Sequence, residues 1–172
     1  MVLQHIVFLI IYPFHISESM AVCPYGWTEY EPWNKCFRFF ATKTSWLKAQ
    51  TDCRNNGGDL ASIEDQATND FITGTILGNV PDSYHQVFIG GWQFKEKGYS
   101  ADHWAWVDGI KMFGYSNWAD NPVDGGSENC MSMLMKNDAW NVRGKWNDVS
   151  CNRKDWFPYI CSRWNTEDGK YS

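Results

Sequence analysis

Six cysteines constrain the fold of this chain more than any other feature. They lie at positions 23, 36, 53, 130, 151 and 161. No two of them form a C-x-x-C pair, which argues against a zinc knuckle or a thioredoxin-like redox site. An even number of cysteines without such pairs indicates three disulfides made in an oxidising compartment. Six cysteines allow 15 pairings, and their spacing alone does not select one.

The N-terminus has the character of a secretory signal. Residues 6–16 form an apolar run too short to span a bilayer, and small residues suited to cleavage follow it. The basic residue usual near Met1 is missing, and the alternative is a buried N-terminal strand. Cleavage after Ser19 or nearby agrees better with the cysteines. We therefore expect a signal peptide over residues 1–19, a secreted, extracellular protein and no membrane span.

The length and composition favour one domain and disfavour several classes of partner. The 172 residues are enough for a sizeable core, and 17% of them are aromatic, including 11 Trp. Such a content indicates core packing in a fold rich in irregular backbone, or an aromatic binding face. The net charge of −5 includes no block of like charge, so we expect neither a nucleic-acid partner nor a polybasic membrane patch.

Two helices are predicted in the first half of the chain. For the first helix, Ser45 is a suitable N-cap, and Gly57 and Gly58 end the pattern. Between them, one face recurs at helical spacing: Trp46, Ala49, Gln50 and Cys53. Ser62 and Asp65 form a capping-box pattern for the second helix. Its apolar face is predicted to include Ile63, Ala67, Phe71 and Leu77.

The rest of the chain predicts short strands and one long loop. A hairpin is expected from Cys23–Trp27 and Cys36–Phe40, with further strands at Val87–Ile89, Trp104–Trp106, Cys130–Met135 and Tyr159–Cys161. Residues 109–129 are rich in Gly, Asn and Asp and show little periodicity. A loop of that length in a compact domain is usually functional or disordered.

Trp146, Asn147 and Asp148 form the most suggestive short motif. Neighbouring side chains in a strand point to opposite faces, so the Asn-Asp pair is expected to converge only where a strand breaks or turns. Converging amide and carboxylate oxygens suit a hard cation such as Ca²⁺. The alternative interpretation is an ordinary turn. Trp146 itself is expected in the core.

In combination, these segments resemble the long form of the C-type lectin-like domain. The matching pieces are WLKAQTDC (46–53), GGDLASI (57–63), FIGG (88–91), WAWVDG (104–109), SENC (127–130), KWND with Cys151 (145–151) and YIC (159–161). The resemblance covers Cys23 to about Arg163. It implies an α+β domain over residues 20–164, with two helices flanking two small antiparallel sheets and a long irregular loop region. Residues 165–172 are expected to be a frayed tail.

The resemblance also implies the disulfide pairing. Its three bridges fall on Cys23–Cys36, Cys53–Cys161 and Cys130–Cys151. No cysteine remains for a bridge to a second chain, and the oligomeric state is left open.

In calcium-binding members of the family, one ion is held by a Glu-Pro-Asn or Gln-Pro-Asp tripeptide, a Glu before a core cysteine, and an Asn-Asp pair. Matched residue by residue, the metal and sugar ligands here are Asn121, Glu128, Asn147 and Asp148. The tripeptide falls on Asn121-Pro122-Val123, and Val123 offers no oxygen. Four side-chain donors therefore stand where the full site has five. The family's accessory calcium site is not expected, because its acidic positions fall near Gln93 and Lys97.

These residues lead to two functional hypotheses. The first is a secreted carbohydrate-binding module, assisted by calcium through an incomplete site, with a glycan or glycoprotein as its partner. The alternative is a calcium-independent domain that recognises a protein, a lipid or a surface through aromatics such as Trp118 and Trp140; Val123 favours it. An enzyme is not expected, because His85 and His103 are the only histidines after the signal and no nucleophile motif accompanies them.

Overall fold

The computed structural model describes residues 22–94, 103–112, 114–119, 128–139, 141–152 and 157–166. The strands are β1 (Thr28–Tyr30), β2 (Lys35–Thr44), β3 (Asp59–Leu60), β4 (Gln86–Phe94), β5 (His103–Trp106), β6 (Cys130–Leu134), β7 (Trp146–Val149) and β8 (Phe157–Trp164). The helical segments are α1 (Trp46–Asn55), α2 (Gln66–Phe71), the π-helical turn η2 (Ile72–Ile76) and the 3₁₀ turns η1 (Glu31–Trp33) and η3 (Asp82–Tyr84).

The domain predicted over residues 20–164 begins and ends close to the first and last described residues. The expected signal peptide over residues 1–19 and residues 167–172 fall outside them. Asn165, where the expected tail begins, is buried, and its backbone N–H donates to the carbonyl of Asn34 at 2.7 Å. Among the residues that the structure describes, no helix is long and apolar enough to cross a membrane.

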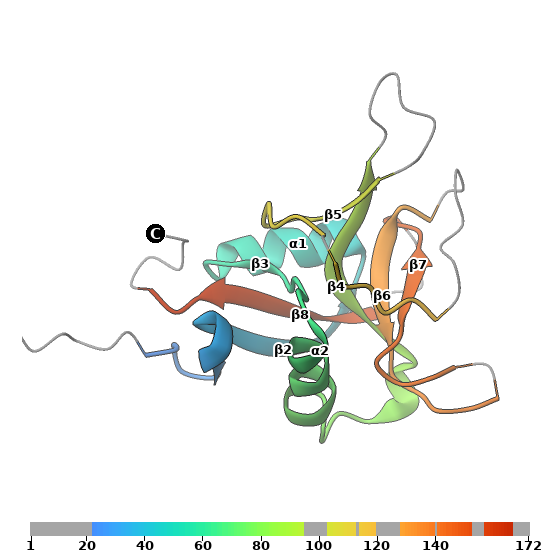
Figure 1. Cartoon of the computed structure of the whole chain (residues 1–172), viewed down its shortest axis with the longest axis horizontal. Helices are drawn as coiled ribbons and strands as arrows, with labels where there is room; N and C mark the ends of the chain where they lie inside the picture. The colour runs from blue at the N-terminus through green and yellow to red at the C-terminus, as the bar shows by residue number, and fades with distance from the viewer. Residues whose placement is uncertain are drawn as a thin grey trace, which may run out of the picture.

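The strands form one connected sheet in the order β1-β2-β8-β4-β6-β7, with β3 added to β8 and β5 added to β4. Every pairing is antiparallel except that of β4 with β8, which meet in parallel where Phe88 faces Tyr159. The two antiparallel groups implied by the family resemblance are therefore joined at this single pair. Figure 1 shows α1 and α2 on either side of the β2–β8 pair.

β8 divides the interior into two hydrophobic clusters because its side chains alternate between its faces. Tyr159 and Cys161 pack with α1, whereas Ile160 packs with the segment that contains α2 and η2. The chain thus meets the expectation of an α+β domain with two helices flanking the sheet.

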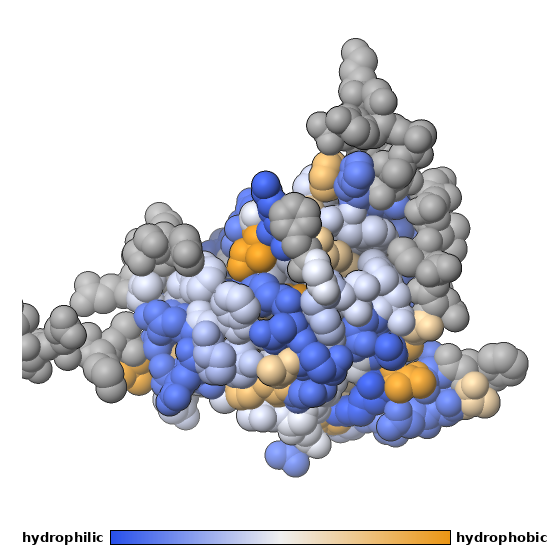
Figure 2. Space-filling view, in the orientation of Figure 1, coloured by the Kyte–Doolittle hydropathy of each residue, from blue (hydrophilic) through white to orange (hydrophobic). Residues whose placement is uncertain are grey.

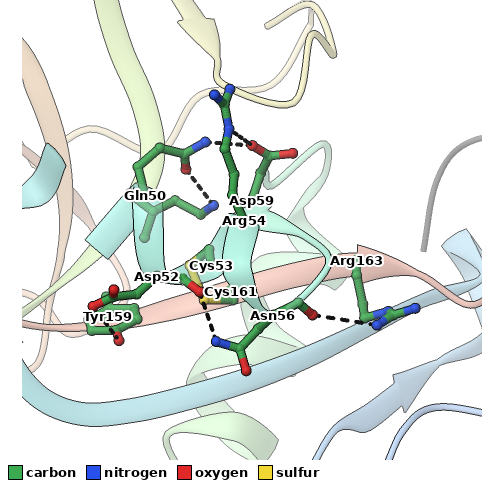
Figure 3. Close-up of a disulfide and its surroundings, with 10 residues drawn as sticks. Gln50, Asp52, Cys53, Arg54, Asn56, Asp59, Tyr159, Cys161 and Arg163 are labelled. Carbon is green, nitrogen blue, oxygen red and sulfur yellow. Dashed lines mark hydrogen bonds and ion pairs between the residues drawn. A yellow bond between two sulfur atoms is a disulfide. The ribbon is translucent and has the colours of Figure 1, made fainter. Parts of the chain in front are cut away.

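α1 forms as its sequence predicts. The Ser45 hydroxyl accepts a hydrogen bond from the backbone N–H of Lys48 at 3.4 Å, and the buried face consists of Trp46, Ala49, Gln50 and Cys53. Figure 3 shows the middle and the C-terminal end of this helix tied to their surroundings: Gln50 donates to Asp59 at 2.5 Å, and Arg163 donates to the Asn56 carbonyl at 3.4 Å.

The disulfides join the same pairs that the resemblance implies: Cys23 to Cys36, Cys53 to Cys161 and Cys130 to Cys151. The bridge from Cys53 to Cys161 ties α1 to β8 across a sequence separation of 108 residues (Figure 3). In the chain-entropy model, a loop of this size contributes about 4 to 5 kcal/mol to stability.

α2 departs from the sequence prediction at its start and at one residue of its predicted buried face. Its N-cap is Asp65, whose carboxylate accepts from the backbone N–H of Thr68 at 2.6 Å. The predicted cap at Ser62 is wrong, because the Ser62 hydroxyl is buried and accepts from Lys35 Nζ at 2.7 Å. Of the predicted face, Ile63 and Leu77 are fully buried and Phe71 packs against the core, whereas Ala67 is exposed. Thr68, Asn69 and Ile72 are also buried, and the sequence did not predict them.

Candidate functional site

The candidate site is built on β7, and Trp146 fixes that strand in the core. The Trp146 side chain is fully buried. Its ring meets Trp106 and Tyr115 edge-to-face at centroid distances of 5.4 Å each, and Trp118 at 6.0 Å. The prediction that Trp146 is a core residue is confirmed. The residues that follow it, Asn147 and Asp148, are therefore presented from a rigid element.

Two buried asparagines hold the segment that leads into β7. Asn69 accepts a hydrogen bond from Trp146 Nε1 at 3.0 Å and donates to the carbonyl of Gly144 at 3.2 Å. Asn117 donates to the same carbonyl at 2.9 Å. Gly144 has a φ of +87°, a conformation that favours glycine. Neither asparagine was predicted from the sequence. The one available signal was for Asn69, a polar residue at the helical spacing of the buried residues of α2.

Asn147 and Asp148 lie in a regular strand, so the expected strand break and the alternative turn are both wrong. Asn147 faces Ser132 and Asp148 faces Met131 across the β6–β7 ladder. The pair nevertheless brings polar groups together, because the Asn147 side chain turns along the strand. Its Nδ2 atom donates to the backbone carbonyl of Asp148 at 2.8 Å. A half-turn of this amide would place its oxygen beside the same carbonyl.

The structure places the other candidate ligands differently. Glu128 is half-buried and precedes β6; it lies four residues before Ser132, the partner of Asn147. Asn121, Pro122 and Val123 lie outside the described residues. Within the described ranges, no group of three or more His, Cys, Asp or Glu side chains is placed to hold a metal ion. Asn147 and Asp148 therefore contact each other, and Glu128 lies just before the neighbouring strand β6. Asn121 lies outside the described residues.

An aromatic pocket of about 450 Å³ adjoins the start of β7. Its described lining includes Trp104, Tyr115 and Trp118, and Trp118 forms a bridge with Trp146. The rings of Trp104 and Trp118 are 4.8 Å apart. Trp104 Nε1 is buried and has no hydrogen-bond partner in the described part of the chain. The pocket therefore has an aromatic wall, and the unpaired N–H of Trp104 is buried within that wall. Trp140, the other aromatic expected at a binding surface, lies outside the described residues.

Tyr115 is a neutral hydrogen-bonding group in this pocket. Its hydroxyl donates to Gln66 Oε1 at 3.1 Å. Burial, together with the nearby carboxylates of Asp70 and Asp65, raises the pKa of Tyr115 to about 12. The phenol is therefore protonated at every physiological pH.

Gln93 marks the position of the family's accessory calcium site, and it is buried. It faces Trp104 across the β4–β5 ladder, and neither atom of its amide has a partner among the described residues. Lys97 lies outside those residues.

Comparison with known proteins identifies the family. Residues 42–163 match the model of the Lectin C-type domain. The galactose-specific lectin nattectin of Thalassophryne nattereri is 31% identical over 126 residues, which are 72% of this chain and 74% of nattectin. Ladderlectin of Oncorhynchus mykiss is 28% identical over 137 residues, which are 78% of this chain. The chain spans 65% of the length of ladderlectin.

Solved structures share the fold. The cow C-type carbohydrate-recognition domain of CD23, solved in the presence of a GlcNAc2Man3 oligosaccharide, is 29% identical with a TM-score of 0.66, covering 85% of this chain and 98% of that one. A calcium-independent type II antifreeze protein is 28% identical with a TM-score of 0.64, covering 83% of this chain and 95% of that one. The family model matches most of the chain, and the chain therefore belongs to the C-type lectin domain family.

Proposed function

We propose that this chain is a secreted carbohydrate-binding domain, released from a signal peptide over residues 1–19. Asn121, Glu128, Asn147 and Asp148 hold a calcium ion and bond the hydroxyls of a glycan or glycoprotein ligand. One observation carries the proposal: the Asn147 amide and the Asp148 carbonyl lie 2.8 Å apart on a strand fixed by a buried tryptophan.

The candidate ligands offer the oxygen atoms that calcium prefers, but they are fewer than in the family's full site. Calcium takes about six to eight oxygen ligands at about 2.3 to 2.6 Å, so two neighbouring ligand oxygens can lie close together. Asn147, Asp148, Glu128 and Asn121 offer amide and carboxylate oxygens, whereas Val123 offers none. When bound, calcium would coordinate sugar hydroxyls directly. The protein's own part is to orient these hydroxyls through the carboxylates and amides of the four ligands.

The pocket beside β7 is suited to a sugar ring. Trp104 and Trp118 provide aromatic faces, and polar groups make up the larger part of the accessible lining. Nattectin is named as galactose-specific and the CD23 domain was solved with an oligosaccharide, which supports binding, rather than catalysis, as the role of this chain.

A second candidate function is calcium-independent recognition of a protein, lipid or surface. Two observations favour it: Val123 removes a ligand from the site, and a structural relative is described as a calcium-independent type II antifreeze protein. In this case the pocket at Trp104 and Trp118 would form the binding surface without the metal.

The location of the calcium site can be tested with a matched pair of double variants. Asn147→Ala with Asp148→Ala should weaken calcium binding about tenfold or more, because calcium sites depend on the number and charge of their ligands. Asn137→Ala with Asp138→Ala changes the same dipeptide at exposed positions and should leave calcium binding unchanged. Calorimetric calcium titration gives both values, with circular dichroism as a check on folding. Equal calcium affinities for the two variants would contradict the proposed location.

A further inference from the structure

A second pocket, of about 530 Å³, has a lining distinct from that of the pocket beside β7. Its described lining comprises Trp33, Glu64, Asp108, Gly109, Ile110, Lys111 and Trp164. These residues come from η1, the segment before α2, the loop after β5 and the end of β8. The hairpin that contains η1 and strand β7 form opposite edges of the sheet (Figure 1), but the loop after β5 reaches both pockets, because Lys111 lines this one and Met112 lines the pocket beside β7. Figure 2 shows a small hydrophobic area at the loop after β5, within a largely polar face.

The base of this pocket carries an excess of negative charge. Lys35 is 1% exposed; its ammonium donates to Glu64 Oε1 at 2.5 Å and lies 3.7 Å from Asp108 Oδ2. The Ser62 hydroxyl, which accepts from Lys35, donates to Asp108 Oδ2 at 2.5 Å. Two carboxylates thus share one ammonium. The ionised cluster retains one negative charge, and an uncompensated charge in a buried position is unfavourable.

One acceptor of the cluster is left over. The Glu64 side chain is only 9% exposed, and its Oε2 atom has no hydrogen-bond partner among the described residues. Lys35, Ser62 and Asp108 already satisfy one another. Buried acceptors are almost always paired in folded proteins. Glu64 lines the pocket, and a rotation of its carboxylate would bring the buried Oε2 atom to a donor that enters the pocket.

The walls suit a positively charged group on an apolar stem. Trp33 Nε1 donates to Asp65 Oδ2 at 3.0 Å, which fixes the orientation of that indole. The Trp164 ring already attracts one ammonium, since Lys35 Nζ lies 4.7 Å from its centroid. Indole faces attract cations, and Ile110 adds apolar surface. Lys111 is exposed at the rim, so the negative excess is confined to the base.

We propose that this pocket binds a small alkylammonium cation. The ammonium group donates to Glu64 Oε2, and the aliphatic stem lies between Trp33 and Trp164. This binding is independent of calcium and of the proposed carbohydrate site, since none of Glu128, Asn147 and Asp148 lines the pocket.

The test is a titration of the full chain with n-butylammonium, with 1-butanol as the neutral probe of the same stem. The readout is the indole N–H resonances of Trp33 and Trp164 in nitrogen-15 NMR spectra, recorded with a calcium chelator present. Butylammonium should shift these resonances with a dissociation constant in the millimolar range, which is reasonable for a ligand of this size. Butanol should bind about tenfold more weakly, because it lacks the charge that strengthens the hydrogen bond.

Three variants place the cation. Glu64→Gln should weaken butylammonium binding about tenfold, because it removes the charged acceptor. Lys111→Gln should strengthen binding, because it removes a like charge from the rim. Asp82→Asn makes the same acid-to-amide change at an exposed site in η3 and should have no effect.

Trp33→Leu provides an independent test if Glu64→Gln fails to fold, because the Trp33 indole is 39% exposed and its loss disturbs the core little. This variant should also weaken binding, followed at Trp164. The proposal would be overturned if butylammonium caused no shifts or if butanol bound equally well. It would also be overturned if neither Glu64→Gln nor Trp33→Leu weakened butylammonium binding.

Discussion

At the scale of single residues, Val123 decides how many oxygens the calcium site offers. Replacing Val123 by Asn adds an amide oxygen, and replacing Asn121 by Glu lengthens the first ligand and adds a charge. The double variant Val123→Asn with Asn121→Glu restores the family's Glu-Pro-Asn tripeptide. Its calcium affinity should rise about tenfold, because ligand number and charge tune calcium sites. Mannose-type sugars should become detectable ligands of this variant.

Calorimetry with calcium measures this gain. Val142→Asn is the matched control, because Val142 is 57% exposed and lies outside the proposed ligand set. It should leave calcium affinity unchanged. An affinity of the double variant equal to that of the wild type would show that residues 121–123 do not contribute to the site, and would favour the calcium-independent function.

At the scale of secondary-structure elements, the N-terminus of α2 depends on one carboxylate. Burial raises the pKa of Asp65, but hydrogen bonds from Thr68, Trp33 and Ala67 outweigh it and hold this pKa below its usual value of 3.8. A carboxyl whose pKa is lower in the folded state stabilises the protein above the unfolded pKa. That contribution is lost as the pH falls through the folded pKa. The cap of α2 therefore weakens below about pH 4.

Asp65→Ala tests this cap. The substitution should lower the free energy of unfolding at pH 7 by about 1 kcal/mol, which is typical of a lost N-cap. The difference from the wild type should shrink as the pH falls below 3.8, because the Asp65 carboxyl of the unfolded wild-type chain then binds a proton more readily than that of the folded chain. Urea unfolding at pH 7 and at pH 3 measures both differences. Asp82→Ala, at an exposed position in η3, is the control. A difference that stays constant between the two pH values would contradict the assigned role.

The two helices also show where local sequence signals are enough to predict the structure. α1 was predictable because its cap and its buried spacing both lie within a few residues. The start of α2 was not, because Ser62 and Asp65 both resemble caps. What separates them is Lys35, which lies 27 residues before Ser62 and occupies its hydroxyl. The strand character of Asn147 and Asp148 likewise follows from pairing with β6, although the two residue types alone favour a turn.

At the scale of the whole molecule, the cysteines and the ordered family motifs predicted the α+β fold and its helices. The polar contacts that shape the two sites were not predictable in the same way. Asn69 meets Gly144 across 75 residues, and Ser62 meets Asp108 across 46. Such pairs leave no periodic pattern in the sequence, because each partner is ordinary in its own segment. The fold brings them together and places the two pockets on either side of the loop after β5.

Galactose titration of the chain, in calcium and then in chelator, tests the proposed calcium-assisted carbohydrate binding most directly. Galactose is the appropriate first probe because nattectin is named as specific for it. We predict weak binding in calcium, in the millimolar range expected of one small sugar at an incomplete site. Binding should disappear when the chelator is added and return with excess calcium. Galactose affinity that is the same with and without calcium would contradict a calcium-assisted carbohydrate site.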